Sequence, residues 1–156
     1  MSKVNPIPQG HSPLVPQLTM KNSAKAMAFY QAAFGATEDF RLLEPSGKVG
    51  HIELRIGGAV LTMADEYPDF GCLSPATIGG SPVRLQLYVA DVDAAVDRAV
   101  KAGATLVRPL RDEFYGDRTA TVADPFGYTW NLASRCEEIS PAEMQARWDQ
   151  VMTQSA

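Results

Sequence analysis

The stretch YGDR at residues 115–118 is followed closely by DPFGYTWN at residues 124–131, and together they predict two strands joined by a tight turn. In DPFG an aspartate and a glycine bracket a proline, which fixes φ for the turn. The runs on either side, residues 119–123 and 128–133, have the side chains that strands favour. An antiparallel hairpin is therefore expected here, and it completes a set of strands that begins further upstream.

The order of predicted elements ahead of this hairpin occurs twice along the chain. A strand is followed by a helix, which begins at Asn22 or Ser23 in the first copy and at Asp91 in the second. Gly35 and Gly103, each followed by Ala-Thr, end these helices about 68 residues apart. This self-similarity predicts a repeat in which each copy reads strand, helix, strand, strand, strand. One copy has too little core to be stable alone, so the two copies are expected to pack together.

The length of 156 residues predicts a single domain, residues 1–156, with a sizeable core. The first module spans about residues 12–66 and the second about residues 83–134, with the Pro- and Gly-rich residues 66–82 as a connecting loop. A capping box that begins at Ser140, with proline at the first helical position, predicts a last helix over residues 140–153. The apolar stripe of this helix must cover the domain's own sheet or a partner subunit.

The Gly-Gly pair at residues 57–58 sets the register of the hairpin in the first module. It joins strands at residues 49–56 and 59–65 as a two-residue loop, and counting back from it places Glu53 opposite Thr62. Cross-strand partners share a sheet face. One face of this hairpin is therefore expected to be polar, and its side chains include His51, Glu53, Arg55 and Thr62.

The register of the last hairpin follows from its DPFG turn in the same way. If these four residues form the loop, Ala123 pairs with Tyr128. Ala120 then lies opposite Asn131, and Arg118 shares the sheet face of Asn131.

Composition and charge exclude several classes of protein. A net charge of −4 disfavours a surface for nucleic acid or for an anionic membrane. No apolar run is long enough to span a membrane, and residues 1–11 lack the apolar stretch of a secretory signal. Cys72 and Cys136 fit no metal-binding pattern and are expected to be free thiols in a reducing cytoplasm. No nucleophile motif, phosphate loop or dinucleotide fingerprint is present.

Several short motifs, together with the two βαβββ modules, resemble those of the vicinal-oxygen-chelate superfamily, the group of glyoxalases, bleomycin-resistance proteins and extradiol dioxygenases. These motifs are FY at residues 29–30, FG at 34–35, YVADVD at 88–93 and DPFG at 124–127. FYGDR at residues 114–118, HIEL at 51–54 and SPAE at 140–143 look like the PhnB-like branch. The resemblance implies an α+β fold in which two tandem βαβββ modules form a curved, half-open mixed sheet with helices outside, plus a C-terminal helix.

The resemblance also locates the metal site of the metal-dependent members, in which four strands each supply one ligand, usually His, Glu, His and Glu. On that pattern this chain has Val15, Thr62, Arg84 and Asn131. Valine has no donor atom, and an arginine repels a cation. No cofactor and no metal at these positions is therefore expected, a divalent metal elsewhere is disfavoured, and a mechanism that needs the metal as Lewis acid is in doubt.

The resemblance implies that the sheet face carrying these four positions lines a cavity, and strand parity extends the lining. The expected ligand-binding residues are Gln17, His51, Glu53, Thr62, Arg84, Gln86, Tyr115, Arg118 and Asn131. Arg84 and Arg118 could clamp a carboxylate or phosphate; the alternative is an internal salt bridge with Glu53, Asp117 or Asp124. His51 is the candidate catalytic base, and the alternative is a histidine held by Glu53 or a backbone group.

Three functions compete on this evidence. The first is a binding protein of the bleomycin-resistance kind, which holds a small polar or anionic molecule in a metal-free cavity as its partner. The second is a lyase, isomerase or dioxygenase of the same superfamily, with a non-standard metal site or His51 as base. The third is a domain with a vestigial cavity that serves dimerisation. A homodimer is expected in each case. The apolar stripe of the last helix, which includes Trp148, and the open edges of the sheets need to be covered by another surface. The residues do not decide whether the protein is an enzyme.

Overall fold

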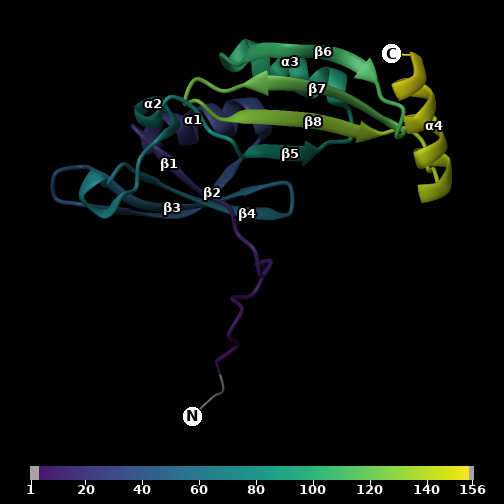
Figure 1. Cartoon of the computed structure of the whole chain (residues 1–156). Coiled ribbons are helices and arrows are strands. Elements are labelled where there is room, and N and C mark those ends of the chain that lie inside the picture. Colours follow the sequence, from purple (N-terminus) through teal and green to yellow (C-terminus); the bar gives the residue numbers. More distant parts are fainter. Residues whose placement is uncertain (1–3, 155–156) are drawn as a thin grey trace. The chain divides into compact units, whose positions relative to one another are not determined.

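The computed structural model describes residues 4–154 and divides the chain into two compact units (Figure 1). The first unit comprises the chain up to Pro82 together with the turn Pro125–Tyr128. The second unit comprises Val83–Asp124 and the chain from Thr129 onward. Each unit contains one four-stranded mixed sheet and a long helix, so the α+β class with two βαβββ modules is confirmed.

The sheet of the first unit has the strand order β1-β4-β3-β2, in which β1 is parallel to β4 and the other pairs are antiparallel. Its elements are β1 (Gln17–Met20), α1 (Ser23–Phe34), β2 (Thr37–Leu43), β3 (Val49–Ile56) and β4 (Ala59–Asp65). Two short helices follow, η1 (Pro68–Phe70) and α2 (Pro75–Ile78).

Helix α1 begins and ends where the capping residues predict. The Asn22 side chain accepts a hydrogen bond from the backbone N–H of Lys25 at 2.9 Å, and Gly35 ends the helix in the left-handed conformation. The stripe of Met27, Tyr30 and Phe34 is buried, and α1 contacts strands β1, β3 and β4. The sheet side chains buried with this stripe are Leu18, Met20, Ile52, Leu54 and Met63.

The register of β3 and β4 is the one that the Gly-Gly loop predicts. Ile56 pairs with Ala59, and Glu53 pairs with Thr62. Since Ile52 and Leu54 are fully buried on the helix side, His51 and its alternate neighbours lie on the opposite, polar face of the sheet. The predicted division of this hairpin into an apolar and a polar face is confirmed.

The sheet of the second unit has the equivalent order β5-β8-β7-β6, with β5 parallel to β8. Its elements are β5 (Arg84–Tyr88), α3 (Val92–Ala102), β6 (Thr105–Asp112), β7 (Asp117–Ala123) and β8 (Thr129–Arg135). The Asp91 side chain caps α3 by accepting a hydrogen bond from the N–H of Ala94 at 3.0 Å. Helix α3 contacts β6, β7 and β8, and buries Val96 and Ala99.

The register predicted for the last hairpin is wrong by one residue. Ala123 pairs with Thr129 rather than with Tyr128, and Asn131 faces Thr121 rather than Ala120. Tyr128 leaves the strand ladder because its hydroxyl bonds the backbone of Thr19, accepting from the N–H at 3.0 Å and donating to the C=O at 3.1 Å. A shift of one residue moves every side chain of a strand to the other face.

The turn of this hairpin is fixed by a close approach within the first unit. Gly127 has a φ of +94°, which side-chain-bearing residues rarely adopt, and a Cβ there would lie 2.7 Å from Cβ of Pro75 at the start of α2. Phe126 of the same turn packs against Phe29 and Tyr30 of α1. The DPFG sequence therefore serves tertiary packing as well as chain reversal.

Helix α4 (Pro141–Gln154) is the predicted C-terminal helix, and the Ser140 hydroxyl accepts from the N–H of Glu143 at 3.2 Å as the capping box requires. Arg147 joins it to the second unit through both carboxylate oxygens of Glu137, at 2.7 and 2.8 Å. Trp148 packs on Phe114, with ring centroids 5.3 Å apart, yet remains 44% exposed. Among the described residues, no helix is long and apolar enough to cross a membrane.

Candidate functional site

Eight of the nine predicted binding residues lie on the polar faces of the two sheets or, in the case of Tyr115, in the turn beside one of them, and Arg118 is the exception. Gln17, His51, Glu53 and Thr62 belong to the first unit. Arg84, Gln86, Tyr115 and Asn131 belong to the second. Each face carries its own pocket, so the two sets are described separately.

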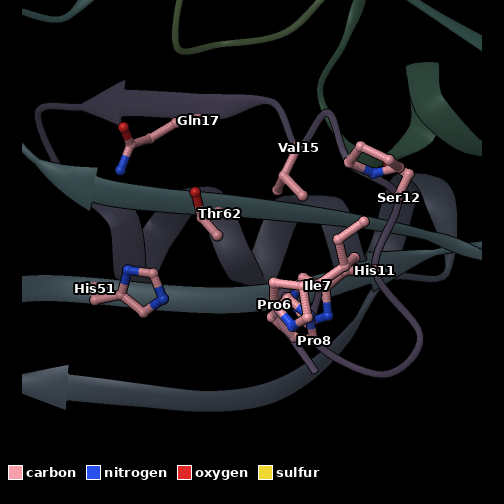
Figure 2. A pocket seen from close by; sticks show the side chains of 10 residues that line it. Pro6, Ile7, Pro8, His11, Ser12, Val15, Gln17, His51 and Thr62 are labelled. Carbon is pink, nitrogen blue, oxygen red and sulfur yellow. The ribbon is translucent and has the colours of Figure 1, made fainter. Parts of the chain in front are cut away.

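The first-unit pocket has a volume of about 410 Å³ and lies between the sheet and the N-terminal segment (Figure 2). Figure 2 shows Gln17, Thr62 and His51 on neighbouring strands, with side chains of the N-terminal segment beside them. The lining residues are Pro6, Ile7, Pro8, His11, Ser12, Pro13, Val15, Gln17, His51 and Thr62. The structure thus brings three of the predicted residues together, and it adds a wall that the sequence reading missed.

Glu53, the fourth predicted residue on this face, is engaged by the N-terminal segment. Its Oε2 lies 3.2 Å from Nε2 of His11, and both side chains are largely buried, at 16% and 15% exposure. The neighbouring Arg55 donates to Asp39 at 2.7 Å and to the backbone C=O of Gly10 at 3.2 Å. The charged side chains on this face are therefore paired with one another or with the N-terminal segment.

His51 is available to the pocket. Its ring lies against Phe40, with centroids 5.4 Å apart. Among residues 4–154 it has no hydrogen-bond or ion-pair partner, and Glu53, one of the partners considered from the sequence, is bound to His11 instead. An imidazole in this position can donate or accept a hydrogen bond from a ligand.

The second-unit pocket has a volume of about 250 Å³ and is lined by Arg84, Gln86, Arg108, Tyr115, Thr121 and Asn131. Gln86 and Thr121 both pair with Asn131 across the sheet, which places all three side chains on one face. The Thr121 hydroxyl donates to Oδ1 of Asn131 at 3.4 Å. Four predicted residues meet here, together with Arg108 and Thr121, which were not predicted.

Two guanidinium groups give the second-unit pocket a positive charge. In the described part of the chain the Arg84 side chain has no ion-pair partner and no hydrogen bond, and the residue is solvent-exposed. Arg108 lies 3.9 Å from Glu113, a carboxylate that Arg111 binds more closely at 2.6 Å. The hydrogen bond from Arg111 lowers the pKa of Glu113. Glu113 therefore stays ionised but is largely satisfied by Arg111.

The Tyr115 hydroxyl adds a neutral donor to this pocket. Burial raises the pKa of Tyr115, so its hydroxyl remains protonated near neutral pH. The amides of Gln86 and Asn131 supply further donors and acceptors in fixed positions on the sheet.

Arg118 is not brought into either pocket. The corrected register places it on the face of β7 that carries the buried Ala120 and Val122. Its guanidinium bonds both oxygens of Asp93 in α3, at 2.8 and 3.0 Å, and Asp112 at 3.0 Å. The hydrogen bond from Arg118 lowers the pKa of Asp93. Arg118 thus joins helix α3 to the sheet through salt bridges with partners that the sequence did not suggest.

Arg108, Thr121 and His11 are the main residues that sequence reasoning missed. Thr121 was missed because the predicted register, which was wrong by one residue, placed Ala120 rather than Thr121 opposite Asn131. Arg108 follows a bulge in β6 between Leu106 and Arg108, which breaks strand parity. The internal repeat is the one signal that could have located Arg108. Arg108 pairs with Thr121 in the second unit as Phe40 pairs with Glu53 in the first. No local signal marked His11, whose contact with Glu53 spans a long stretch of chain.

The four positions at which the sequence resemblance implies metal ligands do not suit a divalent cation. Val15 and Thr62 offer one hydroxyl in the first unit, while Arg84 and Asn131 offer a cation and an amide in the second. A metal site needs several anionic or imidazole donors. No group of three His, Cys, Asp or Glu side chains within residues 4–154 is placed to hold an ion. A divalent metal ion therefore does not fit this donor set.

The comparisons with known proteins agree on one family. A model described as the Glyoxalase/Bleomycin resistance protein/Dioxygenase superfamily matches residues 14–132. The uncharacterized protein Mb0911c of Mycobacterium bovis is 42% identical over 136 residues, which cover 85% of this chain and 90% of that protein.

Solved structures support the same assignment. The X-ray structure of the At5g48480 product of Arabidopsis thaliana has a TM-score of 0.64 and 33% identity, covering 78% of this chain and 98% of that one. The crystal structure of TioX from Micromonospora sp. ML1 has a TM-score of 0.62 and 25% identity, covering 83% of this chain and all of that one.

Proposed function

The chain belongs to the glyoxalase, bleomycin-resistance and dioxygenase superfamily, and on that premise we propose that it binds a small anionic molecule in the second-unit pocket without a metal ion. The observation that carries this proposal is Arg84. It stands at a family ligand position, lies in a pocket with Arg108, and has no ion-pair partner among residues 4–154.

The chemistry of the second-unit pocket favours an anion. A guanidinium presents a planar fork of donors that matches a carboxylate or phosphate. Gln86, Asn131 and the Tyr115 hydroxyl then orient the remainder of the ligand through neutral hydrogen bonds. The fixed positive charge of Arg84 takes the place that a bound cation has in metal-dependent relatives.

A second candidate function is catalysis by a lyase or isomerase of the same superfamily with His51 as base. It is favoured by one observation, the imidazole of His51 in the first-unit pocket with no hydrogen-bond partner among the described residues. Such a base abstracts a proton when a substrate C–H or O–H lies within hydrogen-bond reach. Loss of turnover in His51→Gln, with ligand binding retained, would identify this activity.

We further propose that the protein is a cytoplasmic homodimer of the PhnB-like branch and that its two modules form one domain. The motifs at residues 51–54, 114–118 and 140–143 support the branch. The exposed side chains of Trp148, Val151 and Met152 on α4 support a covered face. Light scattering at low micromolar concentration tests the dimer, and a monomer there rejects it.

The anion proposal is tested by calorimetric titration with inorganic phosphate and with benzoate. Arg84→Met keeps much of the stem volume and removes the charge, so we expect anion affinity to fall by about 1.5–3 kcal/mol, the range for hydrogen bonds to charged groups. Arg118→Met is the matched control, because it removes the same charge on the α3 side of the sheet. Its anion affinity should equal that of the wild type. Unchanged affinity in Arg84→Met, with lowered stability, would reject the proposal.

A further inference from the structure

We propose that helix α4 sets the position of the Tyr115 hydroxyl in the second-unit pocket, and that Phe114 and Trp148 are the positioning residues through which the helix acts. The inference rests on the proposed anion site. It adds to that site a helix that lies outside residues 14–132, the segment that the family model matches. All the groups concerned belong to the second unit.

The turn before β7 places two neighbouring aromatic side chains in different hollows of the second unit. Tyr115 lines the second-unit pocket together with Arg84. Phe114 instead lines a groove of about 250 Å³ along α4, and the other lining residues of this groove are Pro141, Met144, Gln145 and Trp148. The rings of Phe114 and Tyr115 meet edge to face, with centroids 5.1 Å apart. A displacement of the Phe114 ring is therefore expected to reach Tyr115 directly.

The backbone of this turn is fixed to the segment that leads into α4. The C=O of Gly116 accepts from the N–H of Cys136 at 2.9 Å and from the N–H of Glu137 at 3.0 Å. Gly116 has a φ of +88°, and a Cβ there would lie 2.7 Å from the backbone oxygen of Glu137. The N–H of Gly116 donates to the C=O of Glu113 at 3.0 Å, which closes the turn. The turn is thus held at one place against the chain before α4.

Two side chains of α4 hold the same turn from the helix, which stands beside the ends of β7 and β8 (Figure 1). The Arg147 guanidinium donates to the C=O of Phe114 at 3.3 Å while it binds both carboxylate oxygens of Glu137. The Trp148 ring packs on the Phe114 ring, with centroids 5.3 Å apart. Because Trp148 is exposed, its ring adds little to the core, and its contact with Phe114 is the feature to test.

The Tyr115 hydroxyl benefits from being held in place. Tyr115 is half-buried, and this burial raises its pKa, to which the negative charge of Glu113 adds. The protonated hydroxyl can donate to an anion that Arg84 binds. A donor whose position is fixed by its neighbours loses less conformational entropy when a ligand binds. Loosening the contact with α4 should therefore weaken anion binding and lower the pKa of Tyr115.

The position of Tyr115 can be measured without a ligand, from the NMR signals of ring-labelled tyrosine in the full chain. Tyr115→Phe identifies the Tyr115 signal among those of the five tyrosines. We expect the wild-type pKa of Tyr115 to lie above its ordinary value of 10. In Trp148→Ala it should fall toward that value, and Trp148→Phe, which keeps a ring against Phe114, should restore it. An unchanged pKa in Trp148→Ala would overturn the proposal.

Met152→Ala is the matched control, because it removes an exposed apolar side chain from the same helix, one turn beyond Trp148. The pKa of Tyr115 in this variant should equal that of the wild type. Circular dichroism verifies that each variant is folded. Equal shifts of the pKa in Met152→Ala and Trp148→Ala would mean that α4 loosens as a whole, and would overturn the role of Trp148.

Calorimetric titration with inorganic phosphate tests the consequence for binding. Trp148→Ala should weaken phosphate binding by about threefold to tenfold, up to the value of one hydrogen bond. Tyr115→Phe removes the hydroxyl and should weaken it about tenfold. The double variant should bind no more weakly than Tyr115→Phe alone, because the two changes act on one interaction. Losses that add in the double variant would show that α4 does not act through Tyr115, and would overturn the proposal.

The anion site and the role of α4 fail in different ways. A wild type that binds neither phosphate nor benzoate rejects the anion site, and the pKa of Tyr115 then still decides whether α4 positions the hydroxyl. Phosphate binding that is weakened by Arg84→Met but not by Trp148→Ala supports the anion site and overturns the positioning role of α4.

Discussion

The polar face of the first unit and that of the second have equivalent strand pairs but different chemistry. Gln17 faces Thr62 in the first unit, and Gln86 faces Asn131 in the second, each residue 69 positions after its counterpart. On the same count Val15 corresponds to Arg84. The backbone framework is therefore repeated, and the side chain at a single equivalent position, Val15 or Arg84, gives the two pockets a different charge.

The two units also differ in whether the charged side chains on their polar faces have partners. In the first unit the N-terminal segment reaches Glu53 through His11, and Asp39 binds Arg55. In the second unit Arg84 has no such partner among the described residues, and Arg108 has only a distant one. A charged side chain that is held by a neighbour is less free to bind a ligand, whereas an unpaired guanidinium keeps its capacity to bind an anion.

The largest effect on stability is expected from matched truncations of buried side chains on the helix-facing sides of the two sheets. These two sides are expected to be equivalent. Met63 and Leu132 are equivalent by the repeat, and both are fully buried. Met63→Ala and Leu132→Ala should each lower the free energy of unfolding by about 2–5 kcal/mol, through lost burial and the cavity left behind. Urea denaturation followed by circular dichroism measures both. If only one of the two variants lost less than about 1 kcal/mol, which is the scale of a surface substitution, the two cores would not be equivalent.

An exchange of side chains between the pockets should transfer anion binding. In the double variant Val15→Arg with Arg84→Val, we expect phosphate and benzoate to bind in the first unit, with an affinity change at each pocket of about 1.5–3 kcal/mol. NMR shifts of Gln17 and Gln86 report which pocket is occupied. Arg84→Val alone is the control, and it should lose anion binding without any gain in the first unit. An anion that stays in the second unit of the double variant would show that Arg84 does not determine the preference.

The smallest effect concerns Arg118 and the dependence of stability on pH. The hydrogen bond from Arg118 keeps the pKa of Asp93 below its ordinary value of 3.8 in the folded protein. A depressed folded-state pKa contributes stability above the unfolded pKa, and that contribution is lost as the pH falls through the folded value. Arg118→Met should therefore be less stable than the wild type near neutral pH, and the difference should shrink below about pH 4.

Thermal unfolding across this pH range measures the effect. Arg84→Met is its control, because Arg84 has no carboxylate partner in residues 4–154, and its acid profile should follow that of the wild type. A difference between Arg118→Met and the wild type that does not change with pH would mean that the Asp93 pair is not the cause.

Local sequence signals determined much of this protein. The ends of the two long helices are marked by residues that act within one turn of chain, the N-caps Asn22 and Asp91 and the C-caps Gly35 and Gly103. In the structure both helices begin and end at these residues. The Gly-Gly loop fixed the register of β3 and β4 and hence the polar face of the first unit. The repeat and its motifs indicated the family, and the comparisons confirm it.

Tertiary contacts decided the rest, because they join residues far apart in the chain. The hydroxyl of Tyr128 bonds Thr19, which lengthens the last turn by one residue and moves Arg118 from the pocket face to the α3 face. The contact between His11 and Glu53 makes a wall of the first-unit pocket out of a segment for which the sequence predicted no helix or strand. Periodicity and capping signals report only on neighbours along the chain, so the partners of these charges were not visible in the sequence.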